Sequence, residues 1–391
     1  MPQNQHMIAR LISPKLQEAL HYFPVLSITG PRQSGKTTLV RNLFPEYRYV
    51  SLEDPEMRAY ANQDPRGFLA SYGVKLIIDE AQYAPDLFSY IQLSVDELRE
   101  AGLYILTGSQ HFLMSEKISQ SLAGRVAVFV LMPFSHPEIE SGGFPDANVE
   151  ERMFRGAFPD LYARNTPPQL FYSSYIQTYL ERDVRQLLNV GDLSTFQSFM
   201  KVCAGMCGQQ FNMSAISIEI GVSVPTVKRW LSVLETSFAV FLQRPYYRNF
   251  QKRLVKTPRL FFYDTGLVCY LLGIQSAAQL DNYYQKGAIF ENWIVAELIK
   301  WRHHHGIRPD VYFWRDKTGH EVDCVLEEGG VLKLAEIKSG KTIKPDFFKN
   351  LEYIQQNEGL PKSQSFLLYG GEERQKRQKA TVLGWRHFWE V

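Results

Sequence analysis

A glycine-rich octapeptide near the start of the chain restricts the possible fold more than any other feature. Residues 30–37 read Gly-Pro-Arg-Gln-Ser-Gly-Lys-Thr, and this spacing is typical of a loop that wraps its backbone amides around a polyphosphate. Residues 24–29 read as a buried strand and residues 38–43 as the first turns of an amphipathic helix. The pattern predicts an α/β domain with a parallel sheet. The residues expected to bind a nucleotide are Gly30, Pro31, Arg32, Gln33, Ser34, Gly35, Lys36, Thr37 and Thr38.

The chemistry of a nucleoside triphosphate needs further groups, and the chain offers them. Lys36 is expected to face the terminal phosphates, and the hydroxyl of Thr37 to ligate Mg²⁺. Residues 75–82 form an apolar run that ends in two acids, as expected for a central parallel strand whose end faces the nucleotide. Asp79 is expected to hold the metal and Glu80 to polarise the attacking water. The alternative is that both acids only cap the following helix.

Two further segments offer candidate residues for the same site. Residues 103–110 predict a neighbouring strand, and Thr107, Ser109 or Gln110 at its end is either a phosphate sensor or a turn former. Arg125 ends a helical stretch. It is either a catalytic residue that reaches the γ-phosphate of a neighbouring subunit or a solvated cation near the helix terminus.

The length and composition of the chain set broad limits. At 391 residues the chain is too long for one core, and an apolar content of 45% fits two or three globular domains. The net charge of +2 neither requires nor excludes nucleic acid. We find no signal peptide and no apolar stretch long enough to span a bilayer, so we expect a cytoplasmic protein without membrane contact. Cys203 and Cys207, without zinc-site spacing, are expected to pack in a core.

Residues 214–232 predict a helix-turn-helix. A helical pattern is followed by Gly221 and then by a second helix, for which Ser223 is a plausible N-cap. Residues 238–242 could form the strand of a wing, which would complete a winged-helix domain. The side chains expected to lock the two helices together are Ala215, Ile218, Val222, Val227 and Leu231.

The same segment has two possible roles. If it reads DNA, the second helix enters a major groove with Thr226, Lys228, Arg229 and Ser232 on its outer face. A basic stretch with interleaved aromatic residues would then follow the phosphates. The alternative is a packing module with a solvated basic face. The stretch comprises Arg248, Lys252, Arg253, Lys256 and Arg259, with Tyr246, Tyr247 and Phe250.

Residues 319–338 predict a β-hairpin with acids on both arms. Asp323 and Glu336 can converge on one divalent cation, and strand alternation puts Lys338 on the side of Glu336. Glu291, in a helical segment, could complete the cluster, which would form a nuclease site. The alternative is that these residues are surface charges. The histidines at 303–305 cannot all face one metal from a helix, and we expect them at a solvated helix end.

Taken together, these motifs support two resemblances. The spacing of Asp323, Glu336 and Lys338 resembles the signature of the PD-(D/E)xK restriction-endonuclease-like domain. The order of all the motifs, including residues 179–183, 256–267 and 290–292, resembles a prokaryotic family of AAA-type ATPases with a C-terminal domain of unknown function. The resemblance covers nearly the whole chain. It implies ATP rather than GTP as the nucleotide. Residues 263–267 look like a strand that leads into a helix, so Asp264 is expected to cap that helix rather than to act in catalysis.

The resemblance also implies an architecture. We expect an α/β protein with a P-loop NTPase parallel sheet and flanking helices in residues 1–148. A helical and winged-helix domain would occupy residues 149–270, and a small restriction-endonuclease-like α/β domain residues 271–391.

Three functions are consistent with this reading. The leading hypothesis is an ATPase switch or motor that uses ATP and Mg²⁺ and couples hydrolysis to nucleic-acid or protein binding. The second is an ATP-gated, metal-dependent nuclease. The third is an adaptor that binds nucleotide without hydrolysing it and binds DNA through the winged helix. AAA-type relatives often assemble into rings, so a homo-oligomer is possible, but Arg125 alone cannot decide this.

Overall fold

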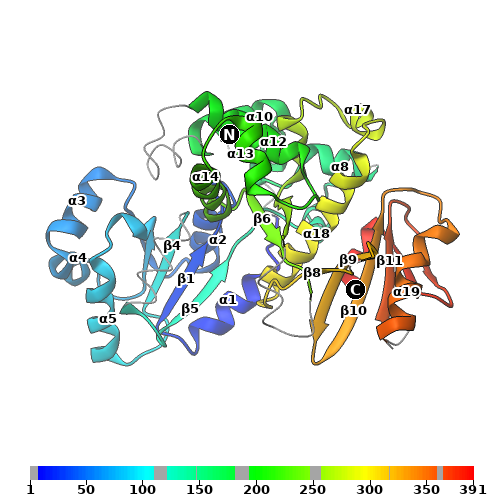
Figure 1. The fold of residues 1–391 in the computed structure, drawn as a ribbon. Helices are drawn as coiled ribbons and strands as arrows, with labels where there is room; N and C mark the ends of the chain where they lie inside the picture. The colour runs from blue at the N-terminus through cyan, green and yellow to red at the C-terminus, as the bar shows by residue number, and fades with distance from the viewer. Residues whose placement is uncertain are drawn as a thin grey trace.

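The structure is a computed structural model that describes most of the chain in three adjoining parts. A first sheet with its helices, a helical middle region and a second sheet follow one another along the chain (Figure 1). Several residues that the sequence analysis singled out lie outside the described residues, namely Gln110, residues 181–183 and residues 247–256. The structure describes residues 8–109, 121–146, 148–180, 193–246, 257–316, 318–358 and 364–391.

The first sheet is parallel throughout, with strand order β2-β3-β4-β1-β5. Strand β1 lies between β4 and β5, so that Val25 pairs with Tyr104 on one side and Val126 on the other. This confirms the α/β fold with a parallel sheet that the sequence predicts. The strands are β1 (Val25–Thr29), β2 (Arg48–Ser51), β3 (Leu76–Asp79), β4 (Tyr104–Gly108) and β5 (Val126–Val130).

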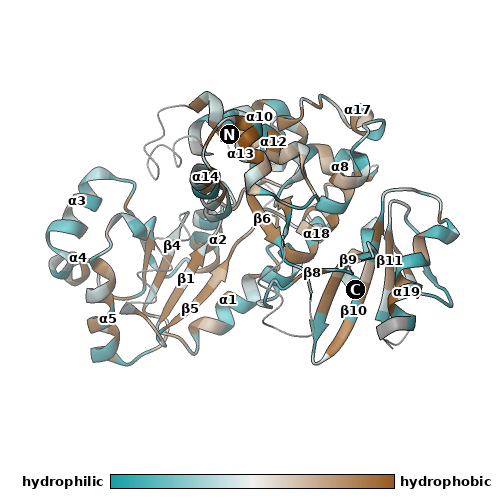
Figure 2. Ribbon diagram, in the orientation of Figure 1, coloured by the Kyte–Doolittle hydropathy of each residue, from teal (hydrophilic) through white to brown (hydrophobic). Residues whose placement is uncertain are grey.

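Helices cover both faces of this sheet because its strands are apolar on both sides. Successive side chains of a strand point to opposite faces. Ile77 therefore packs with α1 and α2, whereas Leu76 and Ile78 pack with α3, α4 and α5. Figure 2 shows the contrast between the hydrophobic strand β1 and the mostly hydrophilic outer helix α3. The helices are α1 (Ser13–Leu20), α2 (Lys36–Leu43), α3 (Pro55–Gln63), α4 (Pro65–Tyr72), η1 (Ala81–Tyr83) and α5 (Leu87–Leu98).

The middle region is mostly helical, as the sequence pattern predicts. Its two short strands, β6 (Val240–Gln243) and β7 (Arg259–Phe262), form an antiparallel pair. Asp264 accepts a hydrogen bond from the backbone N–H of Leu267 and caps α16, which confirms its expected role. The helices are α7 (His136–Ser141), α8 (Val149–Arg155), α9 (Pro159–Ala163), α10 (Pro168–Tyr175), the π-helical turn η2 (Ile176–Leu180), α12 (Leu193–Gly205), α13 (Met213–Ile220), α14 (Val224–Thr236), α16 (Thr265–Leu271) and α17 (Ala277–Asp281).

Helices α13 and α14 form the predicted pair, but their contact differs from the prediction. Gly221 ends α13 in a left-handed conformation and Ser223 caps α14. The prediction that Ala215 and Ile218 lock the helices was wrong, because both are exposed and Ile218 retains 83% of its accessible surface. Ile216 is buried in their place. In an eight-residue helix with five apolar positions, the periodicity alone does not identify the inward face.

The second sheet is mixed, with strand order β12-β13-β11-β10-β9-β8. Strands β9 and β10 form the predicted hairpin, which turns at Gly329 and Gly330, and β10 pairs in parallel with β11. The strands are β8 (Tyr312–Arg315), β9 (Glu321–Glu328), β10 (Val331–Lys338), β11 (Ser365–Tyr369), β12 (Arg374–Lys376) and β13 (Thr381–Gly384). The helical elements beside them are α18 (Lys286–His304), η3 (Pro345–Phe348), α19 (Lys349–Glu358) and η5 (Trp385–Glu390).

Helix α18 joins the middle region to the second sheet. It has 19 residues, 13 of which are buried, because apolar side chains surround its axis. One hydrophobic cluster accordingly runs from Phe134 through the middle helices and α18 to Phe388. His304 is completely buried at the end of this helix, so the prediction of a solvated histidine end was wrong at that position. In the part of the chain that the structure describes, this and every other helix is too short or too polar to cross a bilayer.

Candidate functional site

The glycine-rich loop between β1 and α2 has the conformation that the motif requires. Gly30 has φ 147° and Gly35 has φ 90°, values that favour glycine. At Gly30 a Cβ atom would lie 2.2 Å from the carbonyl oxygen of Leu131, which follows β5. The loop is therefore held tightly against the end of the sheet. This is the site for which the sequence predicts phosphate binding.

Lys36 begins α2, and its side chain curls back into the loop. Its ammonium group donates hydrogen bonds to the carbonyl oxygens of Gly30 at 3.0 Å and Pro31 at 2.8 Å. Only 6% of the residue is exposed. Burial lowers the pKa of Lys36 to about 8, although the negative charges of Glu80 and Asp79 act against this. The side chain thus occupies a position from which it can turn toward a bound polyphosphate.

Asp79 ends β3 beside three hydroxyl groups. The hydroxyls of Thr37 and Tyr49 donate to one carboxylate oxygen at 2.9 Å and 2.8 Å, and the hydroxyl of Thr107 donates to the other. Parallel strands bring Tyr49, Asp79 and Thr107 together, since β2 and β4 flank β3 on its two sides, whereas Thr37 comes from the start of α2. A threonine hydroxyl and a carboxylate side by side are the oxygen ligands that Mg²⁺ takes from a protein when phosphates supply the rest. The residues therefore fit a magnesium ion.

Glu80 follows β3 in a left-handed conformation, with φ 53°. Ser109 donates its hydroxyl hydrogen to one carboxylate oxygen of Glu80 at 2.9 Å, and the side-chain amide of Gln82 donates to the same oxygen. A positive φ is uncommon for a residue with a long side chain, and such conformations concentrate at functional sites. Ser109 thus contacts the acid that the sequence predicts to activate water.

Three domain families together account for most of the chain. Residues 22–140 match an AAA domain, residues 146–278 match a domain of unknown function (DUF8612), and residues 286–388 match a second domain of unknown function (DUF4143). The first match includes the glycine-rich loop, Asp79 and Glu80. The first sheet and its helices are therefore an AAA-type ATPase domain.

Two mycobacterial proteins resemble the chain over most of its length. The uncharacterized proteins Rv2008c of Mycobacterium tuberculosis and Mb2031c of Mycobacterium bovis are each 30% identical to it over 334 residues, which are 84% of this chain and 73% of theirs. The chain belongs to their family. The uncharacterized protein MJ1544 of Methanocaldococcus jannaschii is similar at 19% identity over 353 residues, 81% of this chain and 75% of that protein.

A solved structure also resembles the chain. The Walker-type ATPase PABY2304 of Pyrococcus abyssi aligns with 69% of this chain and 97% of its own, at 15% identity and with a TM-score of 0.48.

Arg125 lies away from the glycine-rich loop of its own chain. It precedes β5, at the edge of the sheet where the parallel strands begin, whereas the loop follows the end of β1. Its guanidinium forms two contacts with the carboxylate of Asp96, at 2.6 Å and 2.9 Å. Within one chain Arg125 therefore does not join the group formed by Lys36, Asp79 and Glu80.

Arg10 connects the glycine-rich loop to the rest of the molecule. Its guanidinium donates to the carbonyl oxygen of Ser34 at 2.9 Å and forms a buried ion pair with Glu138 at 3.0 Å. Burial opposes the ionisation of Glu138, but the charge of Arg10 and two backbone N–H groups keep its pKa below the ordinary value. Arg10 also lies 3.5 Å from the ring of His304, whose pKa burial lowers to about 3. The loop and the end of α18 thus share one buried polar contact.

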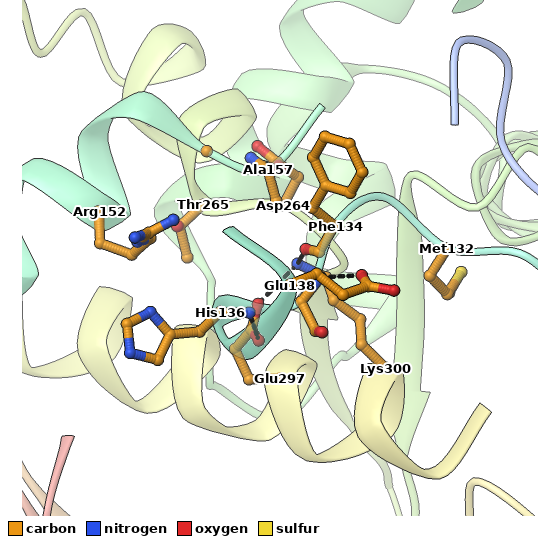
Figure 3. A network of polar contacts seen from close by, with 12 residues as sticks. Met132, Phe134, His136, Glu138, Arg152, Ala157, Asp264, Thr265, Glu297 and Lys300 are labelled. Carbon is orange, nitrogen blue, oxygen red and sulfur yellow. Dashed lines mark hydrogen bonds and ion pairs between the residues drawn. The ribbon is translucent and has the colours of Figure 1, made fainter. Parts of the chain in front are cut away.

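Figure 3 shows a second junction, in which all three family segments meet. Glu297 on α18 accepts a hydrogen bond from the backbone N–H of His136 at 2.7 Å and pairs with Lys300 at 2.8 Å. Asp264 accepts a hydrogen bond from the backbone N–H of Ala157 at 2.8 Å. The contact between Glu297 and His136 thus ties α18 to the AAA domain, and the backbone N–H of Phe134, which donates to the carbonyl oxygen of Ala157 at 2.9 Å, ties the AAA domain to the middle region.

The C-terminal acidic residues come together as the sequence predicts, but with an unexpected neighbour. Lys338 pairs with Glu336 at 2.6 Å and lies 3.7 Å from Asp323. Glu291 and Asp323 both face the guanidinium of Arg259, which comes from β7 in the middle region. Across the described ranges, no three His, Cys, Asp or Glu side chains are arranged to hold a metal ion. The residues as they stand therefore do not fit the divalent cation that the endonuclease resemblance implies.

Sequence reasoning missed several residues that organise these sites. Arg10 lies outside every motif of the sequence analysis, Arg259 was assigned to the basic stretch that would follow phosphates or form a solvated face, and Asn292 had no assigned contact. Asn292 is completely buried and bonds both the N–H and the carbonyl of Phe262, which fixes β7 against α18. The run of apolar residues on both sides of Asn292 was a usable signal, because a polar side chain within a buried helix needs a partner.

Proposed function

We propose that the protein is an ATP-hydrolysing, magnesium-dependent switch that couples hydrolysis to the binding of nucleic acid. The observation that carries the proposal is the convergence of Lys36, Thr37, Asp79 and Glu80 at one edge of the AAA sheet. Lys36 would bind the terminal phosphates, while Thr37 and Asp79 would hold the metal. Bound Mg²⁺ would neutralise charge that develops on the phosphates. The wider nucleotide contacts would come from residues 30–38.

Glu80 is the proposed group that orients the attacking water. The contact with Ser109 supports a sensing role for that serine, because a change in its hydroxyl hydrogen bond would alter the position of the Glu80 carboxylate. Arg125 would take part only if a second copy of the chain presented it to this site, which requires an oligomer.

The middle region supports the DNA part of the proposal. Helices α13 and α14 with the β6–β7 pair have the order of a winged helix, and α14 exposes Lys228, Arg229 and Ser232. An exposed basic helix that follows a tight turn can enter a major groove and contact phosphates. Arg259, which the sequence groups with the phosphate-tracking residues, is instead buried against carboxylates. The remaining cations of that group, at 248, 252, 253 and 256, lie outside the described residues.

The second sheet supports a restriction-endonuclease-like fold through the hairpin that carries Asp323, Glu336 and Lys338. Cleavage is the less favoured function, because Arg259 contacts two of the candidate acids. Hydrolysis coupled to DNA binding therefore remains the proposal.

A single assay tests this coupling. We expect the wild type to hydrolyse Mg²⁺-ATP faster in the presence of a short DNA duplex, and the Lys228→Glu variant to retain its basal rate but bind the duplex about tenfold less tightly. Lys201→Glu makes the same charge change on α12, at another exposed position, and should behave as the wild type. Equal DNA affinity in both variants would remove α14 from the proposed interface, and no turnover in any of them would refute the ATPase.

The pH dependence of nucleotide binding tests the role of Lys36. Only the protonated ammonium attracts phosphate, and the pKa of Lys36 lies at about 8. Raising the pH through this value should therefore weaken binding, so that the Kd for ATP at pH 9 is about tenfold higher than at pH 7. A fluorescent ATP analogue measures this directly. Lys36→Arg, which stays charged over the whole range, should show a flat profile even if its affinity is lower. A flat profile in the wild type would contradict the prediction.

A further inference from the structure

The guanidinium of Arg259 lies among carboxylates of the second sheet and α18. It contacts Glu291, lies 3.1 Å from Glu321 and 3.9 Å from Asp323, and its side chain is 7% exposed. Its Nε atom also donates to the carbonyl oxygen of Gly208 at 2.8 Å, which fixes the direction of the side chain. Three acids from α18 and β9 thus surround one cation that belongs to β7. We call Glu291, Glu321, Asp323 and Glu336 the acidic cluster.

The acidic cluster brings four carboxyl groups beside two cations, the buried Arg259 and the half-buried Lys338. Its four carboxylates face Arg259 and Lys338, with Arg315 3.7 Å from Glu321 at the exposed side. Burial, together with the neighbouring charge of Asp323, raises the pKa of both Glu291 and Glu336 to about 8. The carboxyl groups thus lie close enough together to oppose one another's ionisation, and Arg259 is the buried cation among them.

Two buried atoms indicate where a further ligand could be accommodated. The Oε2 atom of Glu336 has no hydrogen-bond partner, and the residue is 3% exposed. The Nη1 atom of Arg259 has ion-pair neighbours but likewise no hydrogen bond. Unsatisfied buried polar atoms cost free energy and concentrate where a structure changes state or binds an ion. Asp323 connects the two residues, because it contacts both Arg259 and Lys338, and Lys338 pairs with Glu336.

We propose that Arg259 is the resident cation of the acidic cluster and that it excludes a divalent metal ion from it. A guanidinium and a divalent ion would require the same carboxylate oxygens of Glu291 and Asp323, and their positive charges would repel each other at this distance. Removal of Arg259 leaves at least three acids with oxygens free to coordinate, which is the ligand type of Mg²⁺ and Mn²⁺. This inference is independent of ATP hydrolysis.

The position of Arg259 in the chain links the exclusion of a metal ion to the middle region. It begins β7, which pairs with β6 directly after the proposed DNA-contacting helix α14. Any movement of the β6–β7 pair away from α18 would withdraw the guanidinium from the acidic cluster. Metal binding by the second sheet would then depend on the middle region.

Titration of the 391-residue chain with Mn²⁺, followed by calorimetry and by the electron paramagnetic resonance of free Mn²⁺, tests the proposal. All proteins carry Asp79→Asn, so that the ATPase site does not contribute. We expect Arg259→Gln to bind Mn²⁺ at least about tenfold more tightly than the parent, because one positive charge has been removed from among the ligands. Arg259→Lys keeps the charge and should bind as weakly as the parent. Arg259→Gln combined with Asp323→Asn should lose the gain.

Either of two results would overturn the proposal: unchanged Mn²⁺ affinity in Arg259→Gln, or a gain that persists when Asp323 is also replaced. If Arg259→Gln is insoluble, the double variant Arg259→Gln/Glu291→Gln removes the ion pair as a unit and leaves Glu321, Asp323 and Glu336 in place. That variant should also bind Mn²⁺ more tightly than the parent, and equal affinity would again refute the proposal. The titration contains no ATP and does not measure hydrolysis. A failure of this test would therefore not count against the proposed ATPase.

Discussion

Exchange of Glu80 for glutamine is expected to lower the rate of ATP hydrolysis by about a hundredfold or more, because a glutamine cannot accept a proton from the attacking water. ATP binding should persist, since Lys36 and the loop amides are unchanged. Steady-state phosphate release measures the rate, and equilibrium binding of a fluorescent ATP analogue measures the affinity. The substitution keeps the size of the side chain, so the contacts with Ser109 and Gln82 have room to re-form.

The control is Glu97→Gln, an identical change at an exposed position of α5. It should leave both quantities at the wild-type value. Wild-type turnover in Glu80→Gln would show that another group activates the water. Loss of both turnover and binding would show that Glu80 holds the loop together instead.

Truncation of Glu138 to alanine is expected to destabilise the protein by about 3–5 kcal/mol, because the positive charge of Arg10 would remain buried without its partner. The change should appear as a large decrease in the urea midpoint of unfolding, followed by fluorescence. Two backbone N–H groups, of Leu11 and Ser135, would lose their acceptor as well.

Simultaneous replacement of Arg10 and Glu138 by leucine separates these contributions. Removing the ion pair as a unit leaves no uncompensated charge, so the double variant should be more stable than Glu138→Ala. A double variant that is less stable would argue against the charge explanation. Its ATP affinity reports whether the contact from Arg10 to Ser34 also shapes the glycine-rich loop.

The features that the sequence predicted correctly are those whose geometry is determined by residues close together in the chain. The glycine-rich loop, the acids that end β3 and the hairpin with Glu336 and Lys338 are local patterns, in which spacing specifies geometry. The wrong predictions concern side chains whose burial is determined by tertiary packing. Ile218 and Ile216 are equally apolar, and only the surrounding helices determine which one is buried. His304 is buried by residues more than a hundred positions away.

Arg259 illustrates the same limit for a site. In the sequence it lies within a basic stretch, which favours contact with phosphates, and its acidic neighbours come from residues 291, 321 and 323. No local pattern pairs a single arginine with acids that distant. The roles proposed for Arg125 and for the cations of α14 remain predictions, because they depend on partners outside the chain.

Helix α18 touches both chemical regions at fixed points, with Glu291 at Arg259 and His304 at Arg10. Its 19 residues span about 28 Å, and each residue turns the helix by about 100°. Insertion or deletion of one residue between Glu291 and His304 would rotate one of these side chains by about 100° about the helix axis relative to the other, so that both contacts could not form together. The number of residues between Glu291 and His304 is thus constrained, because both contacts of α18 depend on it.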